Sequence, residues 1–199
     1  MKTRTIALAS GALAASLLLA GCSNSMGEMP MGGASSPSES STAPFNDTDV
    51  DFAMNMIIHH TQAIQMADIL LSKSGVDAQV VELAQNIKAA QAPEIETMKS
   101  WLDSWGADGM DGMDGMDGMD HGMGETMSED DMVALENASG PEASRLFLEQ
   151  MTVHHQGAID MAQIEILNGE STEAIALAQK IVSDQTSEIS LMADILATL

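Results

Sequence analysis

Apolar residues recur at every third or fourth position over four long stretches of the sequence. This spacing places them on one face of a helix. The pattern therefore predicts four long amphipathic helices, at about residues 50–71, 77–105, 141–168 and 171–199. Pro93 lies inside the second stretch and is expected to kink or strain that helix, because proline cannot donate the helical hydrogen bond.

Residues that favour helix ends support these limits. One of residues 47–49 is expected to cap the first helix, and Ser74-Gly75 marks its end. A short extra helix is predicted to start at Ser128, where Asp131 has the spacing of a capping box. Pro141 fits the first turn of the next long helix, because that position needs no backbone donor.

The two halves of this region repeat each other. The pattern Phe-x-x-x-Met-x-x-His-His-x-x-Ala-Ile-x-Met-Ala begins at Phe52 and again at Phe147. The segment that begins at Leu83 recurs, with one residue deleted between the two motifs, from Leu177. Each half is one helical hairpin that cannot bury its apolar face alone, so two hairpins facing each other predict a four-helix bundle.

This doubled His-His-x-x-Ala-Ile-x-Met pattern resembles the "domain of unknown function 305" family over about residues 46–199. The resemblance implies an all-α, ferritin-like four-helix bundle. Several members of the family are described as envelope copper-binding proteins, which implies copper binding for this chain too. The shared pattern does not include the insert between the hairpins, which is rich in Met, Gly and Asp.

The start of the chain reads as an export signal. Lys2 and Arg4 precede an apolar run from Ile6 to Ala20, and the run ends in Leu19-Ala20-Gly21-Cys22. This box resembles the bacterial lipoprotein signal, in which the cysteine becomes lipidated. Cys22 is the one cysteine of the chain, which favours that interpretation over an ordinary signal peptide with an incidental cysteine.

These observations predict three segments. Residues 1–21 are expected to be a lipoprotein signal peptide, and residues 22–46 a flexible tether rich in Ser, Pro and Gly. Residues 47–199 are expected to form the helical domain. Its parts are a first hairpin, an insert with a short helix, and a second hairpin, at residues 47–105, 106–140 and 141–199.

Charge narrows the set of partners. The chain carries 30 acidic and 7 basic residues, a net charge of −23. Such a chain is repelled by phosphate backbones, so nucleic acid is not expected as a partner, whereas cations are. Membrane attachment is expected through the lipid anchor alone, which predicts a location in the cell envelope. The bundle can close on itself or exchange hairpins with a second copy.

Histidine and methionine supply the candidate metal ligands. Adjacent histidines on a helix point about 100° apart, so neither pair can clamp an ion unaided. A site must be shared between helices or completed by a methionine one turn away. Met66 and Met161 are expected at the edge of the apolar stripe. The candidate ligands are His59, His60, His154, His155, Met56, Met151, Met66 and Met161.

The other two helices carry polar residues at matching heights. Gln91, Glu94, Gln185 and Glu188 are expected to orient the imidazoles as outer partners. Thioether and imidazole ligands favour Cu(I), with Cu(II), Ag(I) and zinc as alternatives. A second interpretation remains open, in which the histidines form a buried hydrogen-bonded layer that only fixes the register of the helices.

The insert offers a weaker, auxiliary site. Asp-Gly-Met recurs from Asp108 to Met119, and glycine at every third position is hostile to regular structure. The segment is either a solvated loop or a flexible array of soft ligands: Met110, Met113, Met116, Met119, His121 and Met123.

Catalytic patterns do not occur in the sequence. No acidic residue lies three positions before any of the paired histidines, as the di-iron bundles require. The expected function is therefore non-catalytic: copper binding, buffering or hand-over to another envelope copper-handling protein. The leading alternative is a structural or interaction lipoprotein, and a metalloenzyme with an open site comes third.

Overall fold

The computed structural model describes residues 44–107 and 126–199, which lie within one compact unit and are helical without strands. Five α-helices follow each other in these ranges: α1 (Asp47–Leu71), α2 (Ala78–Trp105), α3 (Glu129–Asn137), α4 (Gly140–Asn168) and α5 (Thr172–Leu196). The predicted signal peptide, the lipidation of Cys22, most of the tether and the Asp-Gly-Met array lie outside the described residues.

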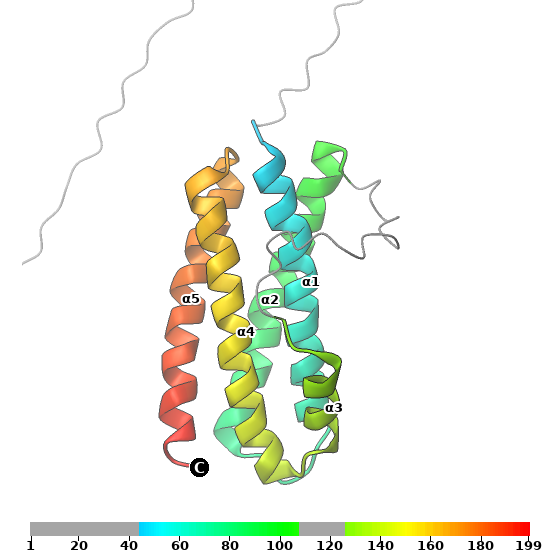
Figure 1. Cartoon of the computed structure of the whole chain (residues 1–199), viewed down its shortest axis with the longest axis vertical. Coiled ribbons are helices and arrows are strands. Elements are labelled where there is room, and N and C mark those ends of the chain that lie inside the picture. Colours follow the sequence, from blue (N-terminus) through cyan, green and yellow to red (C-terminus); the bar gives the residue numbers. More distant parts are fainter. Residues whose placement is uncertain (1–43, 108–125) are drawn as a thin grey trace, which may run out of the picture. The chain divides into compact units, whose positions relative to one another are not determined.

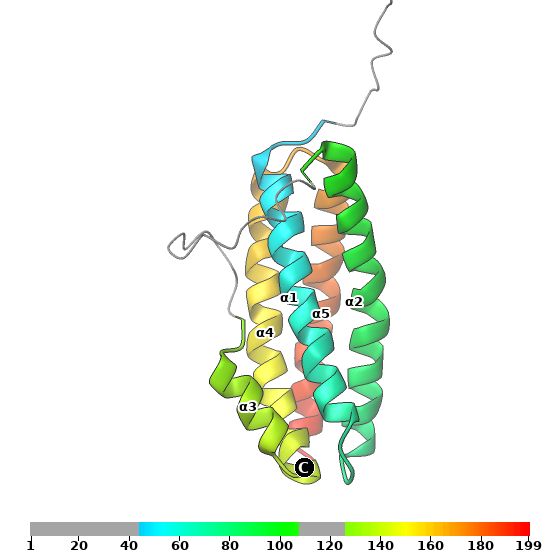
Figure 2. The same ribbon diagram turned by 90° about the vertical axis from the view of Figure 1, so that its right-hand side faces the viewer.

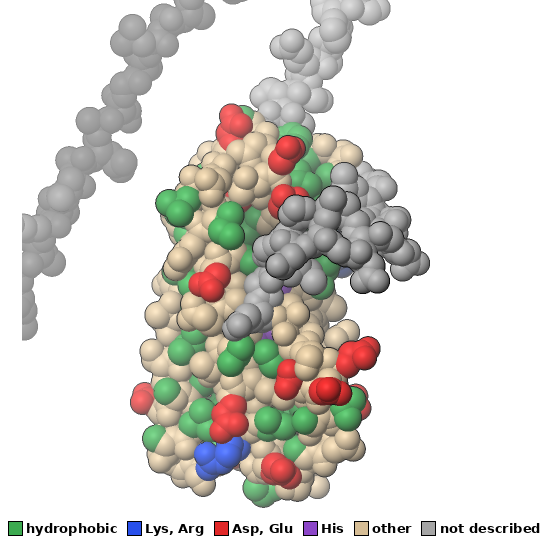
Figure 3. All heavy atoms as spheres, viewed as in Figure 1, with side chains coloured by type: hydrophobic (Ala, Val, Ile, Leu, Met, Phe, Trp, Pro, Cys, Tyr) green, Lys and Arg blue, Asp and Glu red, His purple; other side chains and the backbone are tan. Residues whose placement is uncertain are grey.

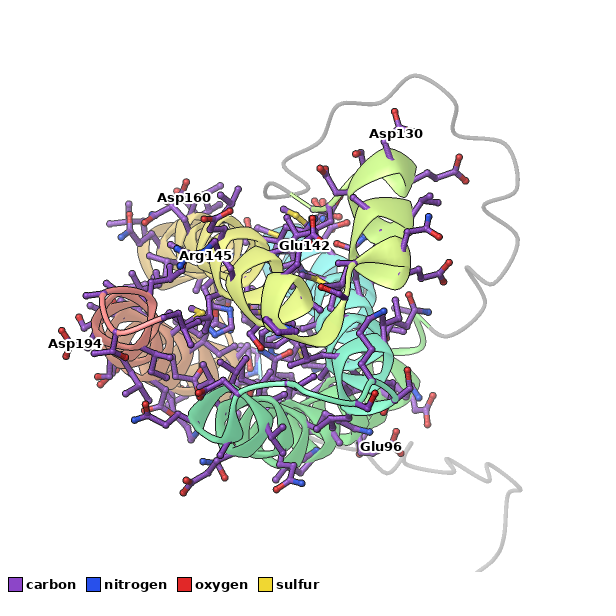
Figure 4. The ribbon with its side chains drawn as sticks, turned by 90° about the horizontal axis from the view of Figure 1, so that it is seen from below. Glu96, Asp130, Glu142, Arg145, Asp160 and Asp194 are labelled. Carbon is purple, nitrogen blue, oxygen red and sulfur yellow. The ribbon has the colours of Figure 1, made fainter. Side chains whose placement is uncertain are left out.

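The four long helices pack as two hairpins. Helices α1 and α2 pack against each other, as do α4 and α5, and the hairpins meet chiefly through α1 and α4 (Figures 1 and 2). Helix α3 packs against α1 and α4. Seen from the end, the long helices surround a common interior, and charged residues such as Glu96, Asp160 and Asp194 point outward (Figure 4).

The ends of the helices follow the sequence pattern with one correction. The N-cap of α1 is Asn46, not one of residues 47–49, because its side-chain oxygen accepts from the backbone N–H of Thr48 and Asp49. The predicted capping box of Ser128 and Asp131 is confirmed at the start of α3. Helix α2 continues through Pro93 without interruption.

Matching contacts hold the two hairpins together at their ends. At the start of α1, the buried carboxylate of Asp49 accepts from the backbone N–H of Glu170 and Ser171, in the turn between α4 and α5. At the other end, the hydroxyl of Ser144 accepts from the backbone N–H of Asp77, which caps α2. Helix α1 therefore runs antiparallel to α4.

The apolar core is divided into two clusters. One contains Phe52, Met56, Met98, Met161 and Ile181. The other contains Met66, Leu70, Phe147, Met151 and Met192 among its members. On each of the four long helices, a segment with buried polar side chains separates the residues of one cluster from those of the other. A polar layer therefore crosses the core between two apolar clusters.

None of the helices in the described ranges is long and apolar enough to cross a membrane.

Asp49 shares its buried site with a second carboxyl group, that of Glu165. Burial and a hydrogen bond with Asp49 raise the pKa of Glu165 to about 8. Burial alone would raise the pKa of Asp49 as well, but hydrogen bonds from backbone N–H groups and from Glu165 hold it below its ordinary value. At neutral pH the pair therefore holds one proton, and Glu165 donates it to the Asp49 carboxylate.

This pair predicts a loss of stability as pH rises from about 4.5 to about 8. A group with a raised pKa stabilises the fold fully below its unfolded pKa of 4.5, and this contribution is lost as pH rises through about 8. Asp49 behaves in the opposite way. Its contribution to stability is present above its unfolded pKa of 3.8 and is lost as pH falls through its lowered pKa in the folded protein. We expect the free energy of unfolding to fall as pH rises from about 4.5 to about 8, and to level off above 8.

Urea unfolding between pH 6 and 9.5 checks this expectation. Glu165→Gln keeps a donor for Asp49 and cannot lose a proton, so its stability should not show the fall that the wild type shows up to about pH 8. Glu149→Gln removes an exposed carboxylate from the same helix and should follow the wild type. An identical pH dependence in all three proteins would show that the pair does not titrate in this range.

Candidate metal centre

The paired histidines lie in the polar layer between the two apolar clusters. His59 and His60 come from the middle of α1, and His154 and His155 from the middle of α4. All four side chains are at most 1% exposed. The antiparallel packing of α1 and α4 brings the two pairs to the same height, because each pair lies near the centre of its helix.

One histidine of each pair faces its counterpart on the other hairpin. The rings of His59 and His154 lie with their centroids 3.6 Å apart and their planes inclined by 37°. Adjacent histidines diverge, as the sequence predicted: the centroids of His154 and His155 are 6.4 Å apart. The layer is therefore shared between helices, and neither pair acts alone.

The other histidine of each pair is anchored to a glutamate on its own hairpin. His60 Nε2 lies 2.9 Å from Glu94 Oε2, and His155 Nε2 lies 2.6 Å from Glu188 Oε2. Since a carboxylate accepts, Nε2 carries the proton in a neutral imidazole, and the lone pair is left on Nδ1. Both Nδ1 atoms are buried, and neither has a hydrogen-bond partner among the described residues.

Burial disfavours the charged form of two of the imidazoles, those of His60 and His154. It lowers the pKa of His60, although the hydrogen bond to Glu94 acts in the other direction. The pKa of His154 is lowered further, by burial and then by the neighbouring His59, His155 and His60. Neutral imidazoles are the form that binds metals, and protons do not compete for them near pH 7.

A lysine from the opposite hairpin joins one of the two His–Glu pairs. Lys180 Nζ lies 3.0 Å from Glu94 Oε1 and 2.7 Å from Asp184 Oδ2. Burial would raise the pKa of Glu94, but its hydrogen bonds with His60 and Lys180 hold that pKa below the ordinary value. Glu94 is therefore an anion in contact with two donors, and it bridges α2 to α5.

Two glutamines complete the layer. Gln91 and Gln185 occupy equivalent positions on α2 and α5, and both are buried. The side-chain oxygen of each is buried without a hydrogen-bond partner in the part of the chain that the structure describes. A buried acceptor without a donor is costly, so these oxygens are further places where a cation or a donor would be accommodated.

The methionines lie on both sides of the layer. Met56 and Met161 belong to one apolar cluster, and Met66 and Met151 to the other. Met66 and Met161, which the sequence places at the edge of the apolar stripe, are both buried. In the antiparallel packing of α1 and α4, the opposite hairpin covers the edge of the helix on which each methionine lies.

Sequence reasoning overlooked two further thioethers. Met98 on α2 lies in the cluster of Met56 and Met161, and Met192 on α5 lies in the cluster of Met66 and Met151. The sequence contained a signal for them, because Met98 and Met192 occupy the same position in the two copies of the repeat. Each end of the polar layer thus has a cluster containing three buried methionines, drawn from both hairpins.

The donor set suits a soft metal ion better than a hard one. Imidazole nitrogen and thioether sulfur are ligands of Cu(I), and Glu94 and Glu188 occupy the outer positions that orient metal-binding histidines in other proteins. Within residues 44–107 and 126–199, no three His, Cys, Asp or Glu side chains are already grouped as a metal site. Ion binding here would require thioether ligands or a rotation of the facing imidazoles of His59 and His154.

Comparison with known proteins places this geometry in context. Among solved structures, a DUF305 protein from Streptomyces coelicolor, provisionally described as secreted, superposes with a TM-score of 0.68 and 33% identity, over 76% of this chain and 91% of that one. No curated protein matches the chain.

A protein named CopM is also similar, and its structures were determined with metals. Its Cu(II)-bound form matches with a TM-score of 0.63 and 34% identity, over 75% of this chain and 96% of CopM. Its Cu(I)-bound form matches with a TM-score of 0.61 and 30% identity, over 77% and 98%. CopM was also solved in an Ag-bound form.

The family assignment rests on the helical region as a whole. The family model for the domain of unknown function DUF305 matches residues 49–196, from the first turn of α1 to the end of α5. This chain belongs to the DUF305 family.

Proposed function

We propose that this protein binds copper through its His/Met layer and acts in the cell envelope as a copper-buffering or copper-delivering lipoprotein. One observation carries the proposal. His60 and His155, each anchored to a glutamate through Nε2, keep an unpartnered, buried Nδ1 in a layer bordered by thioethers. The Cu(I)-, Cu(II)- and Ag-bound forms of the similar CopM support the choice of ion.

The proposed scaffold is a ferritin-like four-helix bundle made of two repeated hairpins. Each hairpin contributes one His-His pair, one glutamate and one glutamine at the height of the layer. The protein binds and releases the ion without catalysing a reaction. Anchoring follows from lipidation of Cys22, and the Met/His-rich insert collects ions for the core.

The acidic surface favours cation capture. Asp and Glu side chains are spread over the face shown in Figure 3, where Lys and Arg form a single small patch. A negative potential around the domain raises the local concentration of cations and repels anionic partners. The same surface is suited to electrostatic steering towards a basic patch on a copper-handling partner.

A structural role for the histidines is the second candidate. The close packing of the His59 and His154 rings supports it, because neutral imidazoles in contact also serve as a packing layer. In that case the layer fixes the register of α1 against α4, and copper binding is confined to the insert.

Anaerobic Cu(I) titration against a competing chelator tests the proposal. The protein starting at residue 44 is compared with a variant that lacks residues 107–123. We expect both proteins to bind Cu(I) with similar affinity, and the shorter one to bind fewer weakly held ions. Loss of tight binding in the shorter protein would assign the copper to the insert, and no binding by either would refute the proposed function.

A further inference from the structure

The two His–Glu pairs are equivalent in the repeat but carry different charge. Glu94 contacts both His60 and Lys180, whereas Glu188 has an ion-pair contact with His155 alone within the described ranges. The repeat aligns Lys180 with Asn86, an exposed residue on α2. The lysine therefore occurs on one side of the layer only.

This difference sets the charge that a bound cation meets. The four imidazoles are neutral in the metal-binding form, Glu94 and Glu188 are negative, and Lys180 is positive. Asp184 pairs with the same ammonium group and is about as exposed as Lys180, 52% against 55%, so it offsets part of the charge of the lysine. Lys180 therefore shifts the charge of the inner groups from −2 towards −1, the charge that a monovalent cation neutralises.

A divalent ion in the same layer leaves excess positive charge in a region with little water. The energy of an ion beside a fixed charge is proportional to the charge of the ion, so a nearby ammonium disfavours a divalent cation twice as much as a monovalent one. Lys180 thus changes the difference in binding free energy between Cu(I) and Cu(II). Glu94, which contacts both Lys180 and His60, transmits the effect of the lysine to His60.

On the basis of the proposed copper site, we infer that Lys180 is a selectivity residue that favours monovalent Cu(I) over divalent Cu(II) and raises the reduction potential of bound copper. Lys180 does not bind the ion. It acts from the second hairpin through the carboxylate of Glu94, which it contacts at 3.0 Å. Its side chain is 55% exposed, so solvent screening limits the effect.

Two variants change the charge beside the His–Glu pairs in opposite directions, and a third serves as a matched control. Lys180→Gln removes the charge, and Asn86→Lys places an equivalent charge where it can reach Glu188. Lys99→Gln is the control, because Lys99 is also 55% exposed but pairs with Glu96 on its own helix. Cu(I) and Cu(II) affinities and the potential of the bound copper are measured for all four proteins, and imidazole ¹⁵N resonances for the metal-free forms.

We expect Lys180→Gln to lower the ratio of Cu(I) to Cu(II) affinity by up to about tenfold, which corresponds to a potential about 59 mV lower for one electron. Asn86→Lys should shift the ratio in the opposite direction, and Lys99→Gln should leave it unchanged. Without metal, Lys180→Gln should move the resonances of His60, and Asn86→Lys those of His155.

Three results would overturn the inference. Equal shifts in Lys180→Gln and Lys99→Gln would show an effect of overall charge alone. An unchanged ratio in Lys180→Gln, with copper bound, would refute the role of Lys180 and leave the proposed function intact. Failure of the wild type to bind copper would refute the proposed function, and the inference with it.

Discussion

Replacing His59, His60, His154 and His155 together by alanine is expected to abolish tight Cu(I) binding. Changes to the outer partners of a metal site typically lower affinity by about 10–100-fold, and removal of the ligands themselves must cost more. We therefore expect the affinity of the helical domain to fall by more than about 100-fold. Competition titration with a Cu(I) chelator under anaerobic conditions measures this loss.

His121→Ala is the matched control, because His121 is the one histidine outside the two pairs. It should keep the tight site. Circular dichroism of the quadruple variant shows whether the fold survives, which we expect because the apolar clusters on both sides of the layer are unchanged. If it unfolds, the double variant His60→Ala/His155→Ala removes only the glutamate-anchored imidazoles. Tight binding by a folded variant without these histidines would exclude them as ligands.

Asp49→Ala is expected to destabilise the fold by about 3–5 kcal/mol, because it removes a buried anion that several donors contact. Asp49 accepts from the backbone N–H groups of Asn46, Glu170 and Ser171. Its loss leaves these donors without an acceptor and separates the start of α1 from the turn between α4 and α5. Urea unfolding at pH 7 measures the change in the free energy of unfolding.

Asp51→Ala provides the comparison, since Asp51 lies two residues further along α1 and is exposed. It removes the same charge without breaking a contact between hairpins, so its effect should stay within about 0.5 kcal/mol. A loss of similar size in both variants would mean that the general charge of α1, rather than the buried contact, determines stability at this end.

The sequence determined the helices and the approximate height of the site, because both depend on local periodicity. Apolar spacing predicted all four long helices and their ends to within a few residues, and the capping box at Ser128 and Asp131 predicted α3. Each His-His pair falls near the centre of its helix, which gives the two pairs similar heights whichever way the helices run. These properties depend on spacing along one helix, which the order of residues specifies directly.

Tertiary structure decided which of these residues meet. The antiparallel packing of α1 and α4 brings the rings of His59 and His154 together and buries Met66 and Met161, which one helix alone would leave at the edge of its apolar stripe. It also brings Asp49 to Glu165, and the packing of the two hairpins brings Lys180 to Glu94.

These contacts join residues that are far apart in the chain. Local pattern cannot specify them, because they depend on the relative rotation and height of two separate helices. The sequence alone thus established a helical repeat with two His-His pairs and soft ligands nearby. The packing of the hairpins decided how those pairs face each other, which nitrogens of His60 and His155 lack a partner, and on which side of the layer a lysine adds its charge.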